Sequence, residues 1–76
     1  MSVGERLKKA RKRKKLTQEE VAELLYCTPQ AISRYETNKI EPNMQTLQKM
    51  CIIYEVSADD IIDVPHFRRN KLKSSQ

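Results

Sequence analysis

Two helix-start signals follow each other so closely that they constrain the middle of the chain. Thr17 can cap a helix, and Glu20 completes a capping box in which each side chain bonds the other's backbone N–H group. Thr28 followed by Pro29 is a second start, since proline is favoured at the first helical position. The earlier helix must end near Tyr26. The pattern predicts two short helices joined by a tight turn.

Three further helices are predicted around this pair. The first helix of the chain covers about residues 4–14, where apolar residues recur at helical spacing. The second member of the pair is the third helix of the chain; it covers about residues 29–37 and ends at Asn38, which tolerates left-handed backbone. Asn43 can cap a fourth helix, and Ser57 with Asp60 a fifth that ends before Pro65. The apolar stripe of the fourth helix is Leu47, Met50, Cys51 and Tyr54.

With 76 residues, the chain can form one domain at most. The sequence therefore predicts an all-α fold, a compact bundle of five short helices over residues 1–64. Residues 65–76 lack a convincing apolar period, and we expect them to form a basic, mobile tail. No run of residues is apolar enough for a membrane span or a signal peptide, so we expect a cytoplasmic protein, complete from its initial Met.

The sequence gives little support for an enzyme or for a metal-binding site. The chain contains no nucleophile–base pair and no glycine-rich phosphate loop, and His66 is expected to be solvated. A helix start favours acidic residues, and this explains Asp59, Asp60 and Asp63 better than a metal site does. We therefore expect no catalytic residues, no metal, no cofactor and no small-molecule ligand.

The two cysteines, Cys27 and Cys51, lack the spacing of a metal or redox motif. Both fall where the helical pattern expects apolar residues. We expect two buried free thiols rather than a disulfide.

Charge is distributed unevenly along the chain. Residues 1–15 contain eight Lys or Arg and one acid, residues 16–64 contain three basic and nine acidic residues, and residues 65–76 contain four basic residues. The basic run at residues 8–15 has two interpretations, a solvated helix face or a surface that binds a polyanion by releasing its counterions. Charge alone does not choose between them.

The predicted helix at residues 29–37 has two different faces. At 100° per residue, Ile32 and Tyr35 point to one side, and Gln30, Ser33, Arg34 and Thr37 to the other. Arginine can donate two hydrogen bonds to guanine, and glutamine pairs similarly with adenine. An ordinary solvated face is the alternative, but the tight turn, the caps and the basic first helix favour DNA recognition.

The run "LTQEEVAELLYCTPQAISRYETNKIEPNMQTLQKM" resembles the helix-turn-helix domain of the phage repressor and Cro type, also called the XRE type. The resemblance rests on the L-T-Q start at residue 16, "VAELL", "TPQAISRYE" and "PNMQTL", and it covers about residues 4–64. It implies a lambda-repressor-like fold in which the second and third helices form the helix-turn-helix. It further implies a sequence-specific transcriptional regulator of double-stranded DNA, most simply a repressor.

The resemblance also assigns roles to individual residues. Arg11 and Glu36 would form an ion pair that fixes the first helix to the third, and Arg11 would still reach a phosphate. The residues implied to contact bases are Thr28, Pro29, Gln30, Ser33 and Arg34. Those implied to contact phosphates are Arg11, Gln18, Thr37, Lys39 and Asn43, with Gln18 also bracing the recognition helix.

The chain departs from the family pattern at several turns. Lys15, Tyr26, Asn38 and Glu55 stand where relatives commonly have glycine. Tyr26 and Glu55 must therefore either adopt left-handed backbone at a cost or change the turn. Pro29 donates no hydrogen bond, so readout would depend on Gln30 and Arg34, with Pro29 packing on a thymine methyl group.

One helix reads too few base pairs for specificity, so we expect a homodimer on a near-palindromic operator with half-sites about 34 Å apart. The candidates for its interface are Ile52, Ile53, Ile62 and Val64, which could instead complete the core. Two other functions stay open. The fold could serve as a protein-interaction module that does not read DNA, or the chain could be the DNA-binding part of a longer sensor protein.

Overall fold

A computed structural model describes residues 1–62, which form five α-helices. They are α1 (Val3–Arg13), α2 (Gln18–Leu25), α3 (Pro29–Glu36), α4 (Met44–Tyr54) and α5 (Ala58–Ile61), and no strand occurs among these residues. The predicted all-α fold is confirmed, and the ends of α1, α2 and α3 lie within about one residue of those expected, whereas α5 ends at Ile61, before the expected limit at Pro65. The tail at residues 65–76, with Asp63 and Val64, lies outside the described residues.

Polar side chains fix where the helices begin. The predicted capping box at α2 is present: the Thr17 N–H donates to Glu20 Oε1 at 2.8 Å, and the Glu20 N–H donates to Thr17 Oγ1 at 3.0 Å. Asn43 Oδ1 accepts from the N–H of Thr46, which confirms the predicted cap of α4. These side chains satisfy N–H groups that have no partner inside the helix.

The turns after four of the helices use left-handed backbone at residues other than glycine. Lys15, Tyr26, Asn38 and Glu55 have φ angles of 59°, 57°, 63° and 57°. Of the two alternatives stated for Tyr26 and Glu55, left-handed backbone is therefore the one that the structure has. The conformation costs an ordinary L-residue roughly 1–2 kcal/mol, because its Cβ approaches the following carbonyl oxygen.

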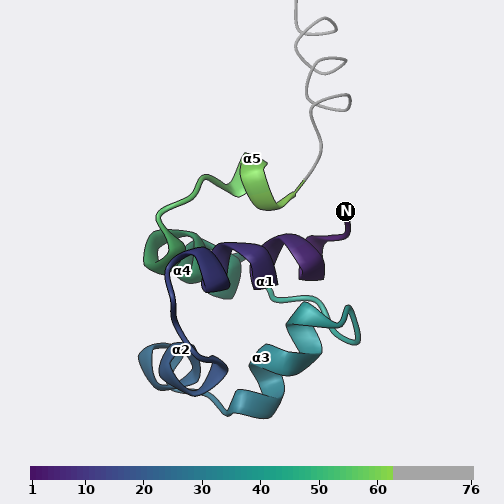
Figure 1. The fold of residues 1–76 in the computed structure, drawn as a ribbon. Coiled ribbons are helices and arrows are strands. Elements are labelled where there is room, and N and C mark those ends of the chain that lie inside the picture. Colours follow the sequence, from purple (N-terminus) through teal and green to yellow (C-terminus); the bar gives the residue numbers. More distant parts are fainter. Residues whose placement is uncertain (63–76) are drawn as a thin grey trace, which may run out of the picture.

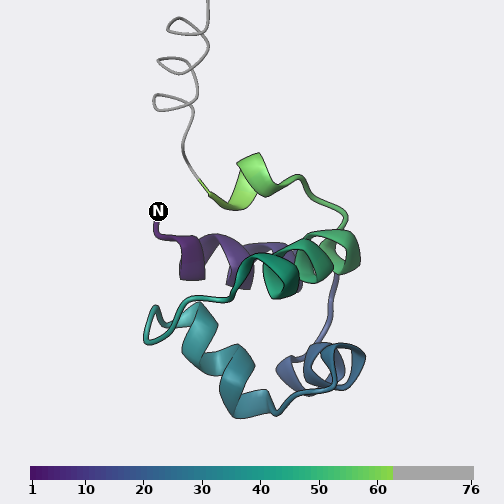
Figure 2. The ribbon, with the colours of Figure 1, turned by 180° about the vertical axis from the view of Figure 1, so that it is seen from behind.

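The helices surround one apolar core. Leu7, Val21, Ile32 and Met50 are fully buried, and Tyr54 and Ile61 are 1% exposed. The predicted stripe of α4 is buried throughout. In Figures 1 and 2, α2 and α3 lie together at one end of the described structure, α1 and α4 cross its middle, and α5 closes the opposite end. This arrangement leaves the outer side of the α2–α3 pair uncovered.

One close approach sets the position of α1 against the C-terminal end of α3. A Cβ atom placed on Gly4 would lie 2.5 Å from the carbonyl oxygen of Glu36 and 2.6 Å from that of Tyr35. Beside it, the Gly4 N–H donates to Asn38 Oδ1 at 3.0 Å, and Asn38 Nδ2 donates to Ser2 Oγ at 2.8 Å. The first turn of α1 is thus anchored to the turn that follows α3.

The prediction of two buried cysteines is wrong for one of them. Both thiols are free, but Cys27 is exposed and only Cys51 is buried. Helix α2 ends at Leu25, so Cys27 lies in the turn, where the helical spacing of buried positions no longer applies. Desolvation by the surrounding atoms raises the pKa of both thiols.

Candidate nucleic-acid interface

Helix α3 presents different residues to the core and to solvent. Ile32 is fully buried and Tyr35 packs against the core from a half-buried position. On the outer side, Gln30 and Arg34 are exposed and Ser33 is half-buried. The division matches the two faces predicted from the spacing, and the exposed residues are those suited to base edges.

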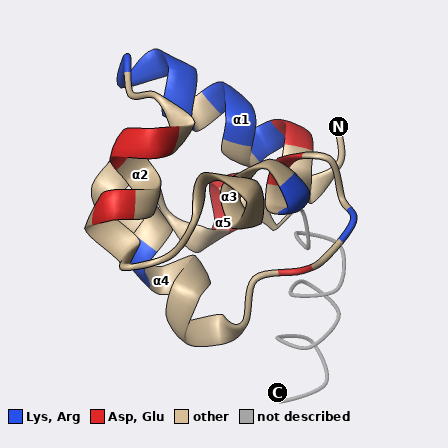
Figure 3. Cartoon of the chain, turned by 90° about the horizontal axis from the view of Figure 1, so that it is seen from below, with Lys and Arg blue, Asp and Glu red and all other residues tan. Residues whose placement is uncertain are grey.

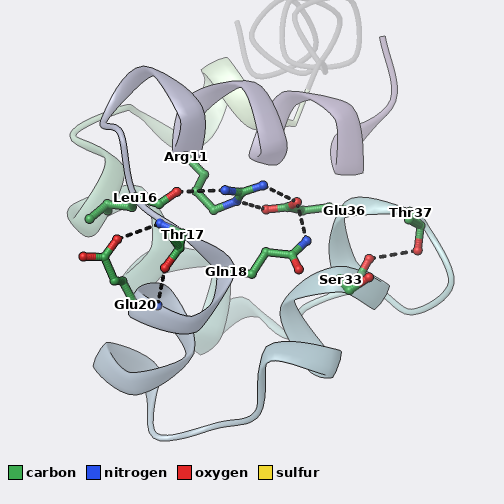
Figure 4. A network of polar contacts seen from close by, with 8 residues as sticks. All are labelled: Arg11, Leu16, Thr17, Gln18, Glu20, Ser33, Glu36 and Thr37. Carbon is green, nitrogen blue, oxygen red and sulfur yellow. Dashed lines mark hydrogen bonds and ion pairs between the residues drawn. The ribbon is translucent and has the colours of Figure 1, made fainter.

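A buried polar network holds α3 to α1 and α2 (Figure 4). Glu36 is 4% exposed and accepts two hydrogen bonds from Arg11, Nε to Oε2 at 2.6 Å and Nη2 to Oε1 at 3.1 Å. Gln18 Nε2 donates to the same Oε1 at 3.1 Å, and Arg11 Nη1 donates to the Leu16 carbonyl at 2.8 Å. Side chains of α1, α2 and α3 therefore meet at one carboxylate, and the α1–α2 turn joins the network through Arg11.

The network also removes the one acid of α3 from the outer face. The side chain of Glu36 is 1% exposed and its charge is matched by Arg11, whose pKa the hydrogen bond to Glu36 raises. A buried carboxylate of this kind is tolerated only when it is paired and hydrogen-bonded. No acidic side chain of α3 therefore faces a ligand approaching its outer side.

The hydroxyl groups at the two ends of α3 are used differently. Thr28 Oγ1 accepts from the Ala31 N–H at 3.2 Å, which leaves the hydroxyl proton of Thr28 free to donate outward. Thr37 Oγ1 instead donates its proton to the Ser33 carbonyl at 2.8 Å. Because phosphate oxygens accept hydrogen bonds, Thr28 is the better placed of the two for a phosphate or base contact.

The loop between α3 and α4 contributes further donors beside this face. Lys39 is exposed, and its backbone N–H donates to the Arg34 carbonyl at 2.9 Å, which keeps the loop against the end of α3. Asn43 is exposed and uses Oδ1 for its cap, so its amide NH₂ group remains available. Pro29 is half-buried at the first position of α3.

Figure 3 shows how charge surrounds this face. Lys and Arg gather on α1, while acidic residues in view lie on α2, on the first turn of α1 and in the loop between α3 and α4. Lys8, Lys9, Lys12 and Arg13 are exposed on α1, whereas Lys14 Nζ bonds Glu55 Oε2 at 2.7 Å. Exposed cations are therefore concentrated on α1, which packs against α3, and Arg34 is exposed on α3 itself.

The comparison with known families bears on this arrangement directly. A family model described as "Helix-turn-helix" matches residues 7–61, from within α1 to the end of α5. The chain belongs to the helix-turn-helix family. The relatives place it with the phage repressor and Cro type, as the resemblance implied.

Three curated relatives share this helix-turn-helix domain. The chain is 41% identical over 63 residues to the SPbeta prophage-derived uncharacterized HTH-type transcriptional regulator YonR of Bacillus subtilis, covering 83% of the chain and 58% of that protein. It is 39% identical over 62 residues to the HTH-type transcriptional activator BcrR of Enterococcus faecalis (82% and 30%). It is 40% identical over 62 residues to the HTH-type transcriptional regulator ImmR of B. subtilis (82% and 49%).

These matches support a DNA-binding domain of the kind found in helix-turn-helix transcriptional regulators. The chain spans between 30% and 58% of the length of these three relatives. Within residues 1–62, no helix of this helix-turn-helix domain is both long and apolar enough to cross a bilayer. In the same residues, no group of three or more His, Cys, Asp or Glu side chains is placed to hold a metal ion.

The candidate dimer residues lie in different environments in the helix-turn-helix domain. Ile53 and Ile62 are half-buried against the core, whereas Ile52 is 75% exposed on α4. Near Ile52, Leu24 is 55% exposed, and a shallow hollow is lined by Leu24, Leu25, Lys49, Ile52 and Ile53. Of the described candidates, Ile52 alone offers an uncovered apolar side chain.

Sequence reasoning missed two features that position the site. The first is the close contact between Gly4 and α3. Its one signal in the sequence is that Gly4 is the chain's single glycine, and the contact itself depends on how the helices pack. The pair Lys14–Glu55 joins residues 41 positions apart, and no local pattern marks it. The left-handed turns, by contrast, could be found because the family's glycines were missing there.

Proposed function

We propose that this helix-turn-helix domain is a sequence-specific transcriptional regulator that binds double-stranded DNA with α3 in the major groove. Gln30 and Arg34 would read base edges, with Thr28, Ser33 and Pro29 beside them. Both glutamine and arginine can make the paired hydrogen bonds that distinguish adenine and guanine. The proposed regulator is a repressor, which acts by occupying an operator that overlaps a promoter.

The observation that carries this proposal is the way α3 is held. The buried network at Glu36 connects α3 to α1 and α2, while Gln30 and Arg34 remain exposed. A helix mounted rigidly by its inner side and free on its outer side suits recognition, because binding then orders few additional groups. An ordinary surface helix has no need of a buried ion pair at its end.

Phosphate contacts would set the orientation of the domain on the duplex. We assign them to Gln18, Lys39 and Asn43, each of which retains a free donor. Arg11 donates to Glu36 and to the Leu16 carbonyl, and Thr37 donates to the Ser33 carbonyl, so their part in the proposal is chiefly to hold α3 and its end. The exposed cations of α1 would add attraction to the duplex that depends on salt rather than on sequence.

The proposal includes a homodimer on a near-palindromic operator, with half-sites about 34 Å apart. Ile52 and Leu24 support it as an exposed apolar pair on α4 and α2, on the side of the hollow described above. A cytoplasmic location follows from the proposed activity, because the protein must share a compartment with its operator.

In-vitro selection of bound duplexes from random sequence tests the proposal. The expected result is a consensus with two related half-sites, bound with an affinity that falls steeply as salt rises. Failure to enrich any consensus would contradict sequence-specific binding and favour the protein-interaction module. Enrichment of a single half-site would contradict the dimer only.

A further inference from the structure

The turn between α2 and α3 contains a side chain that the fold does not use. Tyr26 is 95% exposed, and none of the hydrogen bonds or ion pairs within residues 1–62 involves its side chain. The residue nevertheless adopts left-handed backbone, with φ 57° and ψ 44°, at the C-cap of α2. Glycine would adopt this conformation without strain and would leave no aromatic ring in water.

The other strained turns make the position of Tyr26 distinctive. Asn38 uses its side chain to bond Gly4 and Ser2, and Glu55 pairs with Lys14 at 2.7 Å. The side chains of both residues therefore make contacts within the domain. Lys15 is exposed, but an ammonium group is well solvated in water. Tyr26 is the strained residue of this set whose side chain is largely apolar and makes no such contact.

The location of Tyr26 indicates what it contacts. It stands two residues before Thr28, the N-cap of α3, in the turn at the end of the molecule opposite α5 (Figures 1 and 2). If α3 enters the major groove, a side chain leaving this turn lies at the edge of the groove, where the sugar–phosphate backbone runs. A phenol supplies a neutral O–H donor for phosphate and a flat apolar ring for the sugar.

We propose that Tyr26 is a further DNA-contacting residue whose phenol hydroxyl donates a hydrogen bond to a backbone phosphate beside the half-site. This inference rests on the proposed function. It assigns to the strained turn a role in affinity: the side chain lowers the stability of the free domain and strengthens the complex. The left-handed turn belongs to the fold, but tyrosine is not needed to form it, and residues held in strained backbone cluster at binding sites.

Two variants at this position separate the hydroxyl from the backbone strain. Tyr26→Gly should raise the melting temperature and weaken binding to the selected operator about 3- to 10-fold, the range for one neutral hydrogen bond. Tyr26→Phe keeps the ring and should weaken binding to a similar extent without the gain in stability. Because the phenol is uncharged, the salt dependence of binding should be unchanged in both variants.

Glu55→Gly provides the matched control. It relieves the same left-handed strain at the end of α4, in a turn not assigned to DNA, and it also releases Lys14 from its ion pair, so operator affinity should not fall. Phosphate-ethylation interference supplies a second measurement: one ethylated phosphate that weakens binding of the parent should have no effect on Tyr26→Phe.

The outcomes distinguish this inference from the function on which it rests. A parent protein that enriches no consensus contradicts the proposed function. A parent that enriches a consensus, with Tyr26→Gly binding it equally tightly, overturns only the inference about Tyr26. Equal affinity of Tyr26→Phe and the parent overturns the phosphate hydrogen bond. So does a changed base preference in Tyr26→Phe, because phosphate contacts carry no sequence information.

Discussion

The carboxylate of Glu36 lies against the guanidinium of Arg11, with Oε2 2.6 Å from Nε and Oε1 3.1 Å from Nη2. The two residues come from helices that are distant in sequence, and both are buried. Gln18 joins them at Oε1, so the start of α2 is held by the same carboxylate. The relative positions of three helices therefore depend on a single charged group.

Replacing Glu36 with alanine should destabilise the domain by about 3–5 kcal/mol, because Arg11 would remain buried without its partner. Urea unfolding followed by circular dichroism measures this loss. A double variant, Arg11→Met with Glu36→Leu, removes both charges and should recover much of the stability. If Glu36→Ala were as stable as the parent, the ion pair would have no part in holding α3.

Arg34→Ala should weaken binding to the selected operator by about 1–3 kcal/mol and relax the preference at one base position. Arg34 is exposed, so the melting temperature should hardly change. The comparison variant is Lys39→Ala, expected to weaken all sequences alike and to reduce the dependence on salt. A binding preference unaltered by Arg34→Ala would rule out base reading by this residue.

Much of the fold was predictable because its information is local. Thr17 with Glu20, Thr28 with Pro29 and Asn43 each mark a helix start within a few residues of sequence, and the spacing within α3 separates its two faces. The proximity of Gly4 to the carbonyl of Glu36 was not predictable, since it depends on how two helices cross. The burial of Cys27 was predicted wrongly for a related reason, because it depended on where α2 ends.

Stability in acid should depend on carboxylates that cap helices. The hydrogen bond from the Ser2 backbone lowers the pKa of Glu5 below its usual 4.5, and the corresponding bond from Ser57 lowers that of Asp60. A lowered pKa in the folded state stabilises the protein above the unfolded pKa, and this stabilisation is lost as pH falls through the folded value.

Glu5→Gln isolates this effect, because glutamine can keep the capping bond to the Ser2 N–H without titrating. Its melting temperature should fall less than that of the parent between pH 5 and about pH 3. Thermal unfolding at a series of pH values gives the comparison. Identical slopes for variant and parent over this range would show that Glu5 does not contribute.

Tyr54→Phe should leave the domain equally stable or stabilise it by up to about 1 kcal/mol. The Tyr54 hydroxyl is buried without a hydrogen-bond partner, and burial raises the pKa of the phenol. Removing the oxygen removes that desolvation cost while the ring still fills the core. Urea unfolding measures the change, with Tyr54→Ala, expected to lose about 3–5 kcal/mol, as the control for the ring. A large loss in Tyr54→Phe would mean that the hydroxyl is satisfied in solution.

The contact at Gly4 bears on how freely the specificity of such a domain can change. Gly4 approaches α3 through the backbone oxygens of Tyr35 and Glu36, so this contact is independent of which side chains α3 carries on its outer side. Gln30, Ser33 and Arg34 can therefore be exchanged without altering how α1 and α3 meet. The packing of the helices thus allows different recognition residues to be placed on α3. It requires only that position 4 remains glycine and that Glu36 keeps its ion pair with Arg11.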